Sequence, residues 1–132
     1  MSAVASSLEI AAGRCADPTP EIYARLFAQH PELESEFHMD TDGGVRGGML
    51  SQAFDVLLDL ADGDGTFATA ILMTERANHE GYGIPPRTFF IFLATIRDWV
   101  HHVLSGEWTA DMDRDWRAIL QKAQAICGIS ED

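Results

Sequence analysis

The apolar side chains of this sequence recur mostly every third or fourth residue and only rarely every second residue. That spacing gathers them on one face of a helix, whereas alternation would be typical of a strand. The chain has no convincing strand pattern and no internal repeat. The spacing therefore predicts an all-α fold of six or seven helices.

Prolines and glycines divide the pattern into segments. A first helix is expected over residues 3–15, and the next stops at His30-Pro31 because the residue before a proline leaves the helical region. Residues 31–37 are expected to add one or two turns, and 40–44 and 62–65 are loops by composition. The residues that share faces at helical spacing are Ile22, Tyr23, Leu26 and Phe27; Leu50, Ala53, Phe54, Leu57, Leu58 and Ala61; Phe67, Ala70, Ile71, Thr74, Ala77 and Asn78; Phe89, Phe92, Leu93, Ile96, Val100, Val103 and Leu104; and Trp116, Ile119, Leu120, Ala123 and Ile126.

Size and charge limit the classes of partner. The 132 residues suit one domain over residues 1–132, and 46% apolar residues are enough for a core. The 21 acidic and nine basic side chains give a formal net charge of −12. Such a surface repels phosphate backbones and anionic lipid, so we expect no nucleic-acid and no membrane partner. It suits a freely diffusing protein or one that docks on a basic partner.

The compartment is inferred from the absence of membrane signals and from the cysteines. No apolar run reaches about 18 residues, the length that a bilayer span requires. No Lys or Arg precedes the mildly apolar residues 2–12, so a secretory signal is not expected. Cys15 and Cys127 lie near opposite ends of the sequence without CxxC spacing. The expected location is a reducing cytoplasm, with both thiols free.

Five histidines are the candidates for binding a metal in a pocket between helices. Four of them are interpreted as exposed or capping residues: His30, His38, His101 and His102. His79 differs, since it ends an amphipathic segment just before two glycines and the diproline at 85–86. Such a joint holds one imidazole rigidly. From the residues alone, a structural histidine remains the favoured alternative to a metal ligand.

Several motifs occur in an order that is known from one family. They lie at residues 21–27 (EIYARLF), 30–37 (HPELESEF), 49–54 (MLSQAF), 79–86 (HEGYGIPP), 106–109 (GEWT) and 115–116 (DW). Over residues 17–120 the chain resembles a bacterial globin, of the kind found alone or as the haem domain of flavohaemoglobins. The joint occurrence of the motifs, rather than any single one, carries the resemblance. It implies a globin fold that encloses a pocket for haem b.

The resemblance implies roles for individual residues. His79 becomes the proximal iron ligand, which leaves the opposite axial site open for a diatomic gas. Phe37 matches the aromatic that wedges against the haem, with an ordinary core phenylalanine as the alternative. Tyr23 matches the distal tyrosine whose hydroxyl donates to the ligand, and the alternative is a core tyrosine bonded to a carbonyl. Leu50 matches the apolar residue over the distal face.

Arg46, four residues before Leu50, falls on the distal polar position. It is expected to contact the ligand or a haem propionate, with a plain surface arginine as the alternative. A one-residue shift of the alignment would put Val45 or Gly47 there instead.

The remaining implied haem contacts are Tyr82, Ile84 and Phe89. Phe89 stands where flavohaemoglobins have a tyrosine that orients the proximal histidine. A phenyl ring cannot form that hydrogen bond, so the network is incomplete here.

The function implied by the resemblance is reversible binding of O2, and of NO or CO, for transport, storage or scavenging. One alternative is NO dioxygenation with a separate reductase as redox partner, because no flavin or nicotinamide domain is expected after Asp132. Another is gas sensing through a partner protein. A globin fold that has lost haem is the last alternative, and the presence of His79, Phe37 and Tyr23 argues against it.

Overall fold

The computed structural model describes residues 2–37, 40–81 and 88–128, except for the side chains of residues 75–81. This part of the chain forms six α-helices and two short 3-10 helices and contains no strand, which confirms the all-α prediction. The elements are α1 (Ala3–Arg14), α2 (Thr19–Gln29), η1 (Pro31–Phe37), α3 (Gly44–Asp62), α4 (Thr66–Gly81), α5 (Thr88–Leu104), η2 (Ser105–Glu107) and α6 (Ala110–Ile126).

The helices begin and end at prolines and capping residues of the sequence. Helix α2 has Pro20 in its first turn, where a missing N–H costs nothing, and it ends one residue before His30-Pro31. Helix α6 begins after Thr109, whose side chain accepts a hydrogen bond from the Met112 N–H at 3.0 Å. Acidic side chains in the first turn of α6 favour the positive end of the helix dipole. Thr109 is therefore the N-cap of α6.

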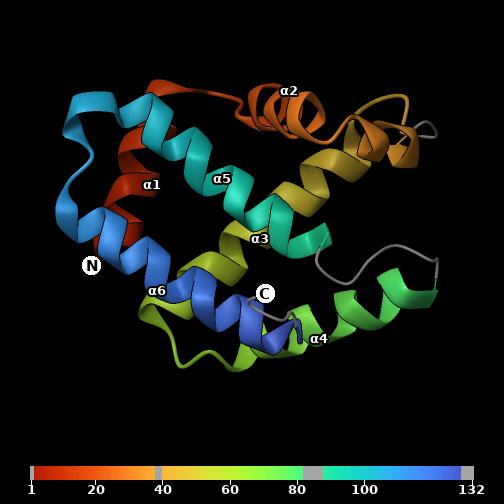
Figure 1. Cartoon of the computed structure of the whole chain (residues 1–132). Helices are drawn as coiled ribbons and strands as arrows, with labels where there is room; N and C mark the ends of the chain where they lie inside the picture. The colour runs from red at the N-terminus through yellow and green to blue at the C-terminus, as the bar shows by residue number, and fades with distance from the viewer. Residues whose placement is uncertain (1, 38–39, 82–87, 129–132) are drawn as a thin grey trace.

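The helices pack around α5, which contacts α1, α2, α4 and α6. In Figure 1, α2 lies at the top of the view and α4 at the bottom. At the right-hand side of that view, η1 and the first turn of α3 lie above, and the last turn of α4 lies below.

The core joins helices from both ends of the sequence. Trp116 on α6 is fully buried, and its Nε1 donates a hydrogen bond to Ser7 Oγ on α1 at 2.8 Å. Leu93 and Ile96 of α5 are also fully buried. No helix in the described ranges is both long enough and apolar enough to cross a bilayer.

The buried faces of α3 and α4 differ from the prediction. Among residues 66–74 of α4, Phe67 is 45% exposed, and the buried residues are Ala68 and Leu72. The Ala68 N–H donates to the Asp59 carboxylate at 2.9 Å, which joins the start of α4 to α3. On α3 the predicted Leu58 is 38% exposed. Further residues that depart from the predicted faces are Ala70 and Thr74, which are exposed, and Val56 and Leu60, which are buried.

Candidate functional site

An aromatic cluster lies where α2, η1 and α5 meet. The Tyr23 ring has its centroid 5.4 Å from that of Phe37 and 5.2 Å from that of Phe92. Phe27 adds a third contact, with its centroid 5.7 Å from Tyr23. Tyr23 is only 2% exposed because it shares the inward face of α2 with Ile22. The cluster packs the ring of Tyr23 among other aromatic rings.

A pocket of about 250 Å³ lies beside this cluster. Its walls come from α2, η1, the loop before α3, α3 itself and the first turn of α5. Apolar side chains predominate, as in most small-molecule sites. The lining residues are Tyr23, Leu26, Leu33, Glu36, Phe37, Asp40, Val45, Met49, Thr88, Phe89 and Phe92.

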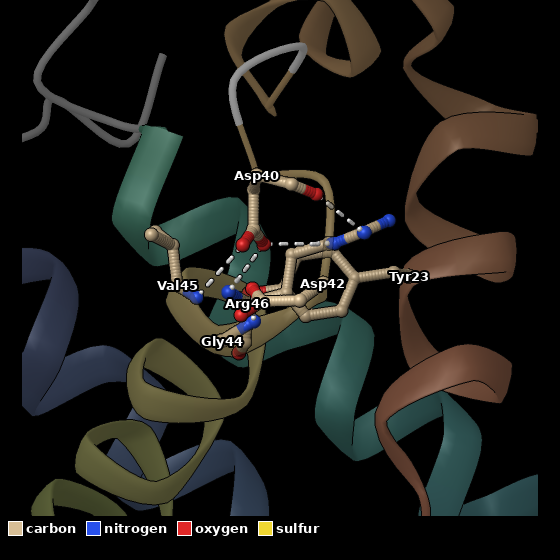
Figure 2. A network of polar contacts seen from close by, with 6 residues as sticks. All are labelled: Tyr23, Asp40, Asp42, Gly44, Val45 and Arg46. Carbon is tan, nitrogen blue, oxygen red and sulfur yellow. Dashed lines mark hydrogen bonds and ion pairs between the residues drawn. The ribbon is translucent and has the colours of Figure 1, made fainter.

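A polar network fixes the edge of the pocket at the start of α3 (Figure 2). The Asp40 carboxylate accepts hydrogen bonds from the backbone N–H groups of Val45 at 3.0 Å and Arg46 at 2.9 Å. The Arg46 side chain folds back, since its Nε donates to the same carboxylate at 3.0 Å and its Nη2 donates to the Asp40 carbonyl at 3.0 Å. The Tyr23 hydroxyl donates to the Arg46 carbonyl at 3.1 Å.

Asp40 acts as the cap that α3 otherwise lacks. The N-cap position is Gly43, which has a left-handed φ of 78° and no side chain to accept a hydrogen bond. Free N–H groups in a first turn attract carboxylates, through hydrogen bonding and through the helix dipole. Asp42 contributes a separate contact, because it accepts from the Gly44 N–H at 2.9 Å. Asp42 thus caps the first residue of the helix, whereas Asp40 caps the next two residues and binds the Arg46 side chain.

Burial and charge set the protonation of the two central groups. Burial raises the pKa of the Tyr23 hydroxyl far above its usual range; the Arg46 guanidinium opposes this shift, and the Asp40 carboxylate adds to it. Burial alone raises the pKa of Asp40, but the N–H groups of Val45 and Arg46 and the guanidinium outweigh it. The net pKa of Asp40 lies below its ordinary value. At neutral pH Tyr23 is therefore a hydrogen-bond donor and Asp40 is an anion.

The structure brings three of the expected site residues to this pocket, namely Tyr23, Phe37 and Phe89. Leu50 is 2% exposed on α3 but is not among the lining residues. The guanidinium of Arg46 is bound to Asp40, and the residue lines a neighbouring open groove of about 1050 Å³.

The predicted iron-ligand side of the site is described only in part. The backbone of His79 lies in the last turn of α4, two residues before the helix ends at Gly81. The side chain of His79, and all of Tyr82 and Ile84, lie outside the described residues. Their roles therefore stay predictions.

Sequence reasoning missed Asp40 as a member of the site. Residues 40–44 read as a loop by composition, and the helix was expected only beyond them. An aspartate shortly before a helix is a known capping pattern, and that signal could have identified the cap. Met49 was missed as a pocket residue, and Phe92 was expected only in the core.

Comparison with known proteins identifies the family. The family model named Globin matches residues 20–127, from the first turn of α2 to the residue after α6. Neither the comparison with curated proteins nor that with solved structures gives a match. The matched range contains the aromatic pocket, the Asp40 network and His79. Together with the all-α architecture, it confirms the predicted fold. The chain belongs to the globin family.

Proposed function

We propose that this globin binds one haem b and reversibly takes up a diatomic gas, with His79 as the iron ligand. One observation carries the proposal: a mostly apolar, aromatic pocket lined by the buried phenol of Tyr23, in a chain of the globin family. Apolar walls of this kind suit a flat apolar group such as a porphyrin. When bound, the haem would supply an iron that can take up a diatomic gas.

The side chains of the pocket have distinct proposed roles. Phe37 and Phe89 pack their rings against the cofactor, and the neutral imidazole of His79 holds it from the end of α4. Tyr23 keeps its proton at neutral pH, because burial raises its pKa, and so it can donate a hydrogen bond to a gas ligand. Further proposed contacts are Leu50, Arg46, Tyr82 and Ile84.

We further propose that the gas is O2, with NO and CO as other ligands, and that the role is transport, storage or scavenging. Phe89, which is 2% exposed, favours this role over NO dioxygenation. Its phenyl ring cannot hydrogen-bond to the proximal imidazole and so cannot make the iron more electron-rich. We also propose that, within the globin family, the chain is similar to bacterial globins and to the haem domains of flavohaemoglobins.

The compartment and partners are also proposals. Cys15 and Cys127 form no disulfide in the described part of the chain, which suits a cytoplasmic protein. The formal net charge of −12 suits docking on a basic redox partner that keeps the iron ferrous.

Absorption spectra of the chain expressed with haem test the proposal. We expect a Soret band in the ferric and ferrous forms, a shift of that band with CO and a persistent spectrum with O2. His79→Ala should abolish ordinary haem incorporation. His102→Ala is the matched control, because His102 is exposed on α5, and it should leave the spectra unchanged. A well-folded helical chain that takes up no haem, or an unchanged ferrous spectrum in His79→Ala, would refute the assignment.

A further inference from the structure

The hydroxyl of Tyr23 is already engaged. A phenol has a single O–H, and in this structure it donates to the Arg46 carbonyl at 3.1 Å. The carbonyl has two lone pairs, so it can accept this bond in addition to a bond within the helix. Tyr23 cannot donate the same proton to a gas ligand at the same time. The Arg46 carbonyl is thus a competitor for the proton that a ligand would use.

Asp40 keeps that competitor in place. Its side chain is 4% exposed and accepts from two successive backbone N–H groups of the first turn of α3, those of Val45 and Arg46. The Arg46 guanidinium closes the arrangement through Nε and Nη2. As Figure 2 shows, the Arg46 side chain is directed toward Asp40, while its backbone carbonyl meets Tyr23. The orientation of the first turn, and hence the position of this carbonyl, depends on Asp40.

We infer that Asp40 is a positioning residue that withholds the Tyr23 hydroxyl from the ligand, and so lowers the affinity for gases that need its hydrogen bond. Arg46 takes part through its backbone carbonyl, and its guanidinium serves to clamp Asp40. The effect on ligand affinity rests on the proposed haem function. The link between Asp40 and Tyr23 does not, because it consists of contacts within the protein.

The first test reads the state of the Tyr23 hydroxyl directly. The chain contains two tyrosines, so ¹³Cζ-tyrosine NMR of the full chain as purified gives two signals, which Tyr23→Phe assigns. We expect Asp40→Asn, a nearly isosteric change, to shift the Tyr23 signal. Asp42→Asn is the matched control, since Asp42 lies in the same loop and accepts from the Gly44 N–H, whereas Asp40 accepts from the N–H groups of Val45 and Arg46. An unshifted Tyr23 signal in Asp40→Asn, or an equal shift in the control, overturns the inference.

The second test measures ligand dissociation by stopped flow. Asp40→Asn should slow O2 dissociation about two- to tenfold, the worth of one neutral hydrogen bond that no longer competes. CO is a much weaker hydrogen-bond acceptor, so its dissociation should change by less than about twofold. Asp42→Asn should leave both rates unchanged. Faster O2 dissociation in Asp40→Asn overturns the inference, because Asp40 would then present Tyr23 to the ligand.

A third variant separates the backbone of Arg46 from its side chain. Arg46→Ala keeps the carbonyl of residue 46 and the hydrogen bonds from the N–H groups of residues 45 and 46 to Asp40. Its effect on the Tyr23 signal should therefore be smaller than that of Asp40→Asn. A larger effect would assign the control of Tyr23 to the guanidinium and overturn the role of Asp40. If the purified chain carries no haem, the proposed function fails, while the NMR signals still decide whether Asp40 positions Tyr23.

Discussion

Tyr23 shows how a single side chain meets two demands. Its ring packs among Phe27, Phe37 and Phe92, and its hydroxyl needs a partner because an unpaired buried donor is costly. The Arg46 carbonyl supplies that partner in the structure. The structure thus shows Tyr23 as a core tyrosine bonded to a carbonyl, and its donation to a gas ligand stays a proposal.

Removal of the Tyr23 hydroxyl should raise the dissociation rate of O2. With a hydrogen bond to the polar ligand worth ~1.5–3 kcal/mol, Tyr23→Phe should release O2 about ten- to hundred-fold faster. Stopped-flow displacement of O2 by CO measures the rate, and the dissociation of CO itself serves as the internal control. If O2 dissociation hardly changes, the Arg46 side chain or a water molecule stabilises the ligand instead.

At the scale of the element, the first turn of α3 links Asp40 to the acid stability of the protein. The pKa of Asp40 lies below its ordinary value of 3.8, so its charged form stabilises the fold fully at and above neutral pH. This contribution is lost as the pH falls below 3.8 and through the folded-state pKa. Asp40→Asn should therefore destabilise the protein at pH 7 and do so much less near pH 3. Urea midpoints of both proteins at the two pH values test this.

The comparison between the two proteins removes the contribution of the other carboxyl groups, which titrate in both. A difference in urea midpoint that stays constant from pH 7 to pH 3 would contradict the depressed pKa of Asp40. A difference that grows toward low pH would mean that folding raises the pKa of Asp40 instead of lowering it.

Elements also show what can be predicted from sequence and what cannot. Prolines and caps act locally, so the end of α2 before His30-Pro31 and the start of α6 at Thr109 were predictable. The buried face of α4 was not, because Ala68 and Phe67 both fit helical spacing. The choice between them depends on how α4 packs against α3, a contact between two helices.

The same reasoning applies to the candidate site. Tyr23, Phe37 and Phe89 were predictable because the resemblance to bacterial globins assigns them to the haem site, and they do line one pocket. The role of the Arg46 carbonyl could not be predicted, because every residue has a backbone carbonyl and the residue type does not show which one accepts a side-chain hydrogen bond. It arises only where α2, the loop with Asp40 and α3 meet.

At the scale of the whole molecule, the question is whether α1 belongs to the domain. The match to the family begins at residue 20, after α1 has ended. Yet Val4, Ser7 and Ala11 of α1 are fully buried, and α1 packs against α5 and α6. Such burial makes α1 part of the core, and we propose that the folding unit includes it.

Ser7→Ala tests this extent of the folding unit. Ser7 Oγ donates to the Val4 carbonyl at 2.7 Å and accepts from Trp116 Nε1, which lies in a fully buried side chain. Its removal leaves the indole N–H unpaired in the core, so the free energy of unfolding should fall by about 1–3 kcal/mol. Ser6→Ala, at a half-buried neighbour, should change it by less than about 0.5 kcal/mol. Urea unfolding followed by circular dichroism measures both. If Ser7→Ala costs no more than Ser6→Ala, then α1 is an appendage that unfolds without the rest of the globin domain.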